Sequence, residues 1–219
     1  HDPFFQFNKM EMIHDEFDLK PKFFFLVGSY GKYDKNISPS KAAYRDLIHG
    51  IAQKYQTGLH PSYSSDSNPE AIRKEKDILS EITGKEVKNT RQHFLKLSLP
   101  ETYQALLKAG LLKDFTMGYA GHSGFRAGTS RSFFFFDLKN NKATPLSVFP
   151  FQVMDVGLKD YEKLTPEKAI QRISSLMQNT KEAGGTFRSL WHNESFSEWQ
   201  GWEGWTQVYK EMLKMASQM

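Results

Sequence analysis

Short apolar runs alternate with longer stretches of helical periodicity, and this alternation constrains the fold of the chain more than any other feature. Residues 21–29 read PKFFFLVGS, an apolar run of strand length. Residues 38–58 follow with apolar side chains at helical spacing, with Pro39 near the expected start and Gly58 as the expected end. Strands that alternate with helices of this length form a mostly parallel sheet covered by helices. We therefore expect an α/β fold, open or closed into a barrel.

The same alternation continues along the chain, and all 219 residues read as a single domain with about six or seven strands. Further strands are expected over 57–60, 86–95, 114–120, 132–138, 145–155 and 186–193. Further helices are expected over 68–84, 99–110, 165–185 and 204–219. Asn-Asn-Lys at 140–142 reads as a hairpin turn, which predicts an antiparallel insertion in the sheet.

Composition excludes several classes of function. The chain has no cysteine, so disulfides, thiolate metal sites and a cysteine nucleophile are ruled out, while the compartment stays open. The net charge is +4, and its lysines and arginines are scattered among acids, so we expect no nucleic-acid partner. No apolar run reaches the roughly 18 residues of a membrane span.

Three histidines fall at or near the ends of predicted strands. His60 closes TGLH, His93 lies in NTRQHF and His192 closes TFRSLWH. The carboxyl ends of parallel strands converge on one face of the sheet, and that face carries the chemistry in such folds. We therefore expect the three imidazoles to share a pocket, with the strand over 186–190 lying beside the one over 57–60.

Each candidate has a functional and a structural interpretation. Asp155, at the end of SVFPFQVMD, could fix the tautomer of a catalytic His192, or could only cap a turn. His60 could bind a metal or polarise a carbonyl, or could bond to backbone in its loop. Arg91 and His93 alternate on the predicted strand, so they would face one pocket together, or lie solvated on an exposed edge.

The glycine-rich segment GHSGFRAGTS (121–130) fits neither common phosphate-binding pattern, nor a nucleophile elbow. We expect it to form a structural or substrate-facing loop. The loop after His192 contains Trp199 and Trp202, and aromatic and polar residues of this kind are typical of a pocket lining.

The segments GLHPSYSS, RQHFLKLSLPETYQALLKAGLLKDFTMGYAGHSGFRAGTS, PFQVMD and LWHN together resemble polysaccharide deacetylase-like proteins of the NodB-homology group. They are most similar to a bacterial branch with GLHPSY and RQHFL signatures, from about residue 21 to the end. The resemblance implies a distorted, here incomplete, (β/α) barrel of about seven strands. It also implies metal-dependent removal of acetyl groups from acetylated sugars.

The resemblance implies roles for individual residues. His60 matches the first histidine of the H-[ST]-x-x-H metal motif, and Arg91 matches the arginine that positions a catalytic aspartate. Asp155 resembles the acid that orients the catalytic histidine, and His192 matches the L-x-H histidine that protonates the leaving amine. The residues expected to contact the carbohydrate are Tyr63, Phe125, Arg126, Trp191 and Asn193.

Two positions depart from the family pattern. Ser64 stands where the second metal histidine belongs, and we expect His93 to substitute for it. The aspartate pair that follows the first strand in the family has no match in 4–27, because Asp2, Asp15 and Asp18 lie in a helix-like stretch. We therefore expect the chain to be the C-terminal part of a longer protein.

The sequence thus predicts a domain that hydrolyses N-acetyl or O-acetyl groups of a carbohydrate by metal-assisted acid/base catalysis when complete. The alternative is a catalytically inactive carbohydrate-binding pseudoenzyme, which Ser64 and the aromatic loop favour. The expected metal is a divalent ion such as zinc. This chain should bind it weakly or not at all, because His60 and His93 supply two ligands where a catalytic zinc usually has three from the protein.

Overall fold

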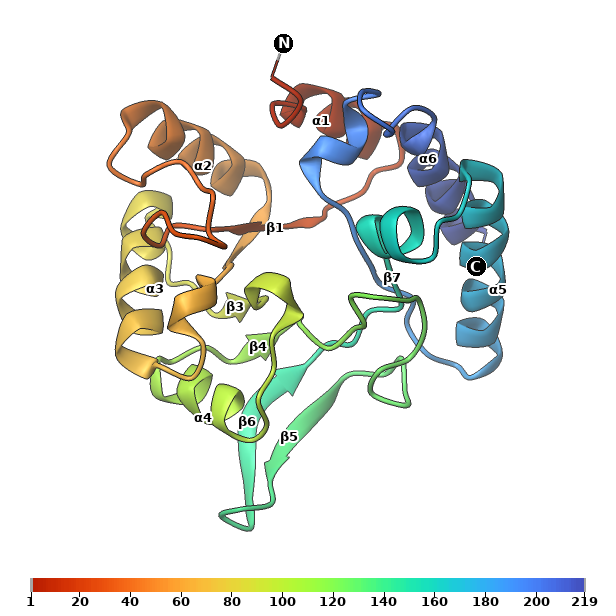
Figure 1. The fold of residues 1–219 in the computed structure, drawn as a ribbon. Coiled ribbons are helices and arrows are strands. Elements are labelled where there is room, and N and C mark those ends of the chain that lie inside the picture. Colours follow the sequence, from red (N-terminus) through yellow and green to blue (C-terminus); the bar gives the residue numbers. More distant parts are fainter. Residues whose placement is uncertain (1, 219) are drawn as a thin grey trace. The chain divides into compact units, whose positions relative to one another are not determined.

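The computed structural model describes residues 2–218, which divide into two compact units (Figure 1). The sheet unit comprises Pro21–Met117 and Ser132–Phe149. The second unit, here called the C-terminal unit, comprises the chain up to Lys20, Gly118–Arg131 and the chain from Pro150 onward. That residues 1–219 form one domain stays a prediction.

The sheet unit is built on a six-stranded sheet, and its mixed, mostly parallel topology confirms the predicted fold class. Its strands, in spatial order, are β1 (Lys22–Phe25), β2 (Gln56–Leu59), β3 (Asn89–Thr90), β4 (Lys113–Asp114), β6 (Lys142–Val148) and β5 (Phe133–Asp137). Neighbours from β1 to β6 pair in parallel, whereas β5 is antiparallel to β6. The antiparallel insertion predicted around 140–142 is therefore confirmed.

Helices α2 (Ala42–Lys54), α3 (Pro69–Thr83) and α4 (Glu101–Lys108) connect the parallel strands and lie side by side along the sheet (Figure 1). The start of α3 follows the predicted signal, because the Asn68 side chain accepts a hydrogen bond from the Ala71 N–H and Pro69 opens the helix. Gly84 ends it with a φ of 68°. The helices bury apolar side chains that include Ile48, Ile72, Leu79 and Leu106.

The C-terminal unit holds a two-stranded parallel sheet, β7 (Val153–Met154) and β8 (Ser189–Leu190). Its helices are α1 (Phe7–Glu16), α5 (Pro166–Glu182) and α6 (Trp205–Ser217), with α5 packed on α6. Two short helical turns follow the strands, η3 (Gly157–Tyr161) after β7 and η4 (Asn193–Phe196) after β8.

The predicted strand over 86–95 is wrong in extent, and with it the expected alternation of Arg91 and His93. Only Asn89–Thr90 is strand, and His93 begins a short 3-10 helix, η2 (His93–Leu95). Beyond Thr90, the Arg91 N–H donates to the Leu59 carbonyl at 3.0 Å and the His93 N–H donates to the Pro61 carbonyl at 3.4 Å. Positive φ angles at Phe94 and Leu95 then turn the chain away from the extended conformation.

Two other boundaries differ for steric reasons. Gly58 does not end α2, which stops at Lys54; it lies within β2, where a Cβ would come 2.6 Å from the Phe24 ring. The expected strand over 145–155 is divided into β6 and β7 around Pro150, which has no N–H to donate to a ladder.

The pairing of the last strand also differs from the prediction. β8 pairs with β7, whereas β2 lies between β1 and β3, so the strand over 186–190 does not lie beside 57–60.

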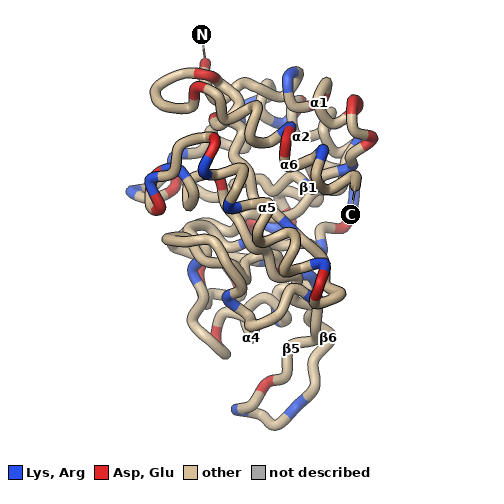
Figure 2. Tube along the Cα trace, turned by 90° about the vertical axis from the view of Figure 1, so that its right-hand side faces the viewer, with Lys and Arg blue, Asp and Glu red and all other residues tan. Residues whose placement is uncertain are grey.

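Lysines and arginines are interspersed with acids along the chain (Figure 2). Between residues 2 and 218, no helix has the length and apolar character needed to cross a membrane.

Candidate functional site

Asp155 and His192 meet at the ends of the two neighbouring strands of the C-terminal unit. Asp155 directly follows β7 and His192 lies two residues beyond β8, while the register pairs Met154 with Leu190. The Asp155 Oδ1 and His192 Nδ1 atoms are 2.7 Å apart, so the predicted hydrogen bond is present. The His192 side chain is 42% exposed, whereas Asp155 is fully buried. A buried carboxylate thus orients an imidazole that reaches solvent.

The surroundings of Asp155 favour its ionised form. Its carboxylate accepts hydrogen bonds from the His192 backbone N–H at 2.6 Å, the Val156 N–H at 2.8 Å and the Ser195 hydroxyl. Burial alone would raise the pKa of Asp155, but the charge of His192 and these hydrogen bonds outweigh it, so the pKa is lowered. A carboxylate only accepts, so His192 Nδ1 carries a proton and Nε2 is the nitrogen that can exchange one. Asp155 thus bonds both the turn that follows β7 and the His192 ring, while its role in catalysis stays a prediction.

Ser195 belongs to this site, and the sequence reasoning did not assign it a role. It is fully buried, and its hydroxyl lies 2.5 Å from the His192 carbonyl and within bonding distance of Asp155 Oδ2. The available signal was its spacing, because a residue three positions after His192 returns to it in one 3-10 turn.

A second group of side chains lies in the sheet unit, where His60 and His93 face each other with ring centroids 4.8 Å apart. His60 Nδ1 lies 2.5 Å from the Arg91 carbonyl, and His93 Nδ1 lies 2.8 Å from Asp34 Oδ1. Carbonyl and carboxylate oxygens only accept hydrogen bonds, so each Nδ1 donates. The Nε2 atoms are therefore the nitrogens suited to ligating a metal.

Asp34 is the other residue that the sequence reasoning missed. It is buried, and its Oδ1 also accepts the Tyr63 backbone N–H at 2.8 Å. The loops that follow the adjacent strands β1, β2 and β3 are thus joined through one carboxylate. Its position beyond β1 was the available signal, but Asp34 lies outside 4–27, the segment where the family pattern predicts an aspartate pair.

Metal binding by this chain stays a prediction. Across 2–218, no cluster of three or more His, Cys, Asp or Glu side chains has a metal-binding arrangement. Ser64 is exposed and carries a hydroxyl, which does not replace an imidazole as a zinc ligand. Its hydroxyl oxygen lies 3.4 Å from that of Ser62. His60 and His93 supply two ligands, whereas a catalytic zinc takes three from the protein.

Arg91 lies beside a buried carboxylate of the sheet unit, Asp114. The Arg91 Nε donates to the Phe115 carbonyl at 3.1 Å, and its guanidinium stacks 4.4 Å over the Phe24 ring. Burial raises the pKa of Asp114 to about 6, against the opposing effects of hydrogen bonds from Thr116 and the charge of Arg91. That Arg91 positions a catalytic aspartate stays a prediction.

The predicted carbohydrate contacts are distributed over both units, and their roles stay predictions. Tyr63 packs against other aromatic rings of the sheet unit. Arg126, next to Phe125, donates to the Gly118 carbonyl at 3.1 Å. The Trp191 ring lies 5.0 Å from that of Tyr209, among the aromatic residues of the C-terminal unit.

The remaining predicted contact, Asn193, donates its side-chain amide to the Phe4 carbonyl. In the loop beyond it, Trp199 is 48% exposed, while Trp202 is buried beneath Lys159. The common pocket for His60, His93 and His192 also stays a prediction.

Comparison with known proteins gives relatives by fold. No protein-family model and no curated protein matches the chain. Among solved structures, a presumptive polysaccharide deacetylase from Mycobacterium smegmatis superposes with a TM-score of 0.70 at 17% identity, covering 99% of this chain and 72% of that one. Puue allantoinase superposes with a TM-score of 0.63 at 12% identity, covering 98% and 67%. The chain therefore shares the fold of these proteins.

Proposed function

We propose that this chain is a deacetylase-like hydrolase domain that removes N-acetyl or O-acetyl groups from a carbohydrate, in the bacterial GLHPSY/RQHFL branch of the NodB-homology group. The fold shared with a presumptive polysaccharide deacetylase supports the class of protein. The observation that carries the chemistry is the 2.7 Å hydrogen bond between buried Asp155 and half-exposed His192.

In this proposal His192 acts as the general acid. An amide carbon–nitrogen bond breaks readily only if the leaving amine takes up a proton as it departs. With Nδ1 bound to Asp155, the proton on Nε2 of the imidazolium passes to the amine as the carbon–nitrogen bond breaks. The oxygen of a water molecule bonds to the acetyl carbon, and one proton of that water restores the imidazolium. The resulting acetic acid ionises to acetate. The Asp155 carboxylate stays ionised because its pKa is lowered, and its negative charge stabilises the imidazolium before transfer.

Acetate release tests the proposal. The chain would be incubated with a tetramer of N-acetylglucosamine, with and without added divalent ions, beside the His192→Asn and Asp155→Asn variants. We expect the His192 variant to lose roughly 100-fold or more in rate, the usual contribution of a general acid. Asp160→Asn is the matched control, because that carboxylate pairs with Lys159 and is 45% exposed. An unchanged rate in the His192 variant would refute the assignment.

A carbohydrate-binding pseudoenzyme is the second candidate. Ser64 at a family metal position and the two-imidazole arrangement of His60 and His93 favour it. The same experiment separates the candidates, because a pseudoenzyme binds the tetramer but releases no acetate under any of the metal conditions.

A further inference from the structure

The residue that follows His93 has a backbone conformation that its side chain disfavours. Phe94 has a φ of 57° and Leu95 a φ of 52°, in the left-handed region that glycine adopts readily and bulky residues avoid. Leu95 is buried, whereas Phe94 is 58% exposed. Two consecutive strained residues thus present the Phe94 side chain to solvent and place the Leu95 side chain in the core. Backbone strain of this kind concentrates at binding and catalytic sites.

The exposed ring joins two tyrosines of the sheet unit. Phe94 lies 5.8 Å from Tyr33 and 5.6 Å from Tyr63 between ring centroids, at interplanar angles of 79° and 85°. The two tyrosine rings lie 4.4 Å apart. We call Tyr33, Tyr63 and Phe94 the aromatic corner, because the Phe94 ring meets each tyrosine ring nearly at a right angle, while the two tyrosine rings are tilted by 42°. Phe94 also lies 4.6 Å from the His93 ring, so the corner borders the imidazole pair.

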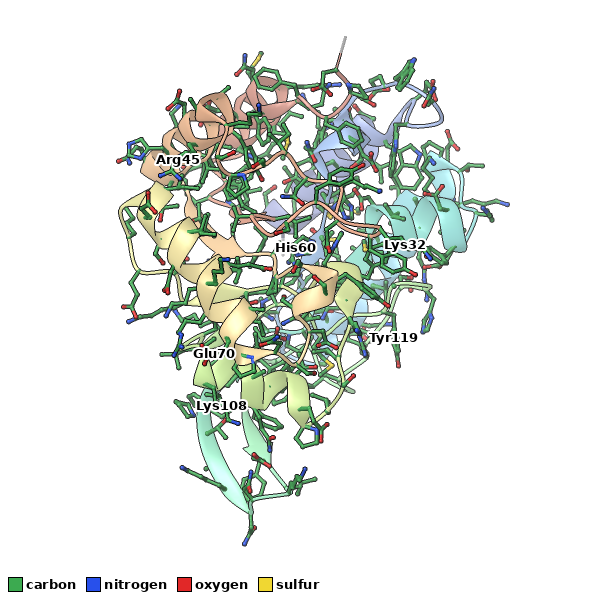
Figure 3. All side chains as sticks on the ribbon, turned by 60° about the vertical axis from the view of Figure 1, so that its left-hand side comes forward. Lys32, Arg45, His60, Glu70, Lys108 and Tyr119 are labelled. Atoms are coloured by element: carbon green, nitrogen blue, oxygen red, sulfur yellow. The ribbon has the colours of Figure 1, made fainter. Side chains whose placement is uncertain are left out.

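The corner is held by the loops that follow β1, β2 and β3. Asp34, next to Tyr33, accepts both the Tyr63 N–H and the His93 ring N–H at 2.8 Å. Figure 3 labels Lys32 on the first of these loops and His60 at the end of β2. One buried carboxylate therefore fixes the loops that carry all three rings.

Cations line the corner. The Lys96 ammonium lies 4.4 Å over the Tyr63 ring and 3.2 Å from the Asp66 carboxylate. The Lys32 ammonium lies 5.2 Å over the Tyr33 ring. These two lysines repel a cationic ligand. Lys96 is already paired with Asp66, which makes it a poor partner for a phosphate.

We propose that the aromatic corner binds a pyranose ring of an uncharged, N-acetylated oligosaccharide; the choice of an acetylated sugar rests on the proposed function. A pyranose has an apolar face of C–H groups and a rim of hydroxyls. The negative faces of Phe94 and Tyr33 attract the polarised C–H groups. The tyrosine hydroxyls and the His93 imidazole offer hydrogen bonds to the rim. After deacetylation the sugar amine is cationic, so the lysines favour release of the product.

Calorimetric titration of the full chain with an N-acetylglucosamine tetramer tests the proposal. Phe94→Gly and Tyr33→Ala should each raise the Kd roughly fivefold, within the range for loss of one aromatic contact. Because glycine adopts positive φ without strain, Phe94→Gly should retain or raise the Tm while it weakens binding. Phe134→Ala is the control, because Phe134 is 69% exposed on β5 and should leave the Kd unchanged.

A second titration, with a glucosamine tetramer at pH 6, tests the charge argument and should show weaker binding than the acetylated tetramer. The proposal is overturned if the wild-type chain does not bind the acetylated tetramer. It is also overturned if the Phe94 variant binds it as tightly as wild type, or if the cationic tetramer binds equally well. Acetate release is a separate readout. If acetate is released but Phe94→Gly leaves the Kd unchanged, only the proposed binding at the aromatic corner is refuted. If Phe94→Gly weakens binding and no acetate is released, the aromatic corner is supported and the proposed hydrolase activity is refuted.

Discussion

Replacing Asp155 by Asn tests the candidate site most directly, because the change keeps the shape of the side chain and removes its charge. The carboxylate accepts bonds from the His192 ring, the His192 N–H, the Val156 N–H and the Ser195 hydroxyl. An amide has one oxygen and one donating nitrogen. Whichever way it is oriented, its NH2 group faces the backbone N–H of either His192 or Val156, and that buried donor loses its acceptor.

The size of the effect follows from these contacts. Leaving a buried donor unsatisfied costs about 1–3 kcal/mol, and hydrogen bonds to a charged group contribute about 1.5–3 kcal/mol each. The remaining amide oxygen keeps part of this stabilisation, so we expect the free energy of unfolding to fall by about 2–4 kcal/mol at neutral pH. The lowered pKa of Asp155 adds a pH dependence. Its contribution is present above the ordinary value of 3.8 and is lost as the pH falls through the folded-state pKa.

Urea unfolding of wild type, Asp155→Asn and Asp160→Asn measures this effect. The exposed Asp160 change should cost about 0.5 kcal/mol or less. NMR titration of His192 in the same proteins should show a lower imidazole pKa in Asp155→Asn, because the neighbouring negative charge is gone. If Asp155→Asn unfolds at the wild-type urea concentration and the His192 titration is unchanged, the carboxylate does not orient the imidazole and the general-acid assignment is wrong.

Three further predictions follow from buried or paired groups. Burial raises the pKa of Asp114 to about 6, so its stabilisation of the fold is complete below 3.8 and is lost as pH rises through 6. In urea unfolding, the free energy of unfolding of Asp114→Asn should therefore rise relative to that of wild type by up to about 3 kcal/mol between pH 4 and pH 7. A difference between the two proteins that does not change with pH would contradict this. Burial lowers the pKa of His14, which lies 3.1 Å from the Tyr209 hydroxyl, to about 4. Its stabilisation is present above 6.5 and is lost as pH falls toward 4, so His14→Gln should flatten the stability of the chain between pH 7 and pH 5; an unchanged slope would show that another group is responsible. The Kd for zinc should be weaker than micromolar, because two imidazoles are fewer than a catalytic site uses. The heat of zinc binding should disappear in His60→Ala or His93→Ala. Calorimetry that shows tight, stoichiometric binding would refute this.

The sequence allowed prediction of features that depend on local signals. The start of α3 at Asn68 and the hairpin between β5 and β6 are set by capping and turn residues whose preferences act over a few positions. The Asp155–His192 bond was predictable because both residues follow short apolar strands, and adjacent parallel strands bring their ends together.

Other features depend on packing and could not be predicted in the same way. Gly58 reads as a helix stop, but its lack of a Cβ serves the approach of Phe24 within the sheet. No local pattern indicates that Phe94 and Leu95 adopt positive φ, since both residues ordinarily avoid it. Asp34 was missed because its partners, Tyr63 and His93, come from loops far along the chain.

Catalysis and binding can be separated experimentally because each candidate group is held by residues of its own unit. Asp155 orients His192 within the C-terminal unit, and Asp34 fixes the loops of the aromatic corner within the sheet unit. If the two proposals are correct, Asp155→Asn should reduce turnover with little change in tetramer affinity, whereas Phe94→Gly should weaken affinity and leave the His192 titration unchanged. If each variant loses both turnover and tetramer affinity, the Asp155–His192 pair and the aromatic corner must act as one site. The effects of the two substitutions would then be non-additive in the double variant.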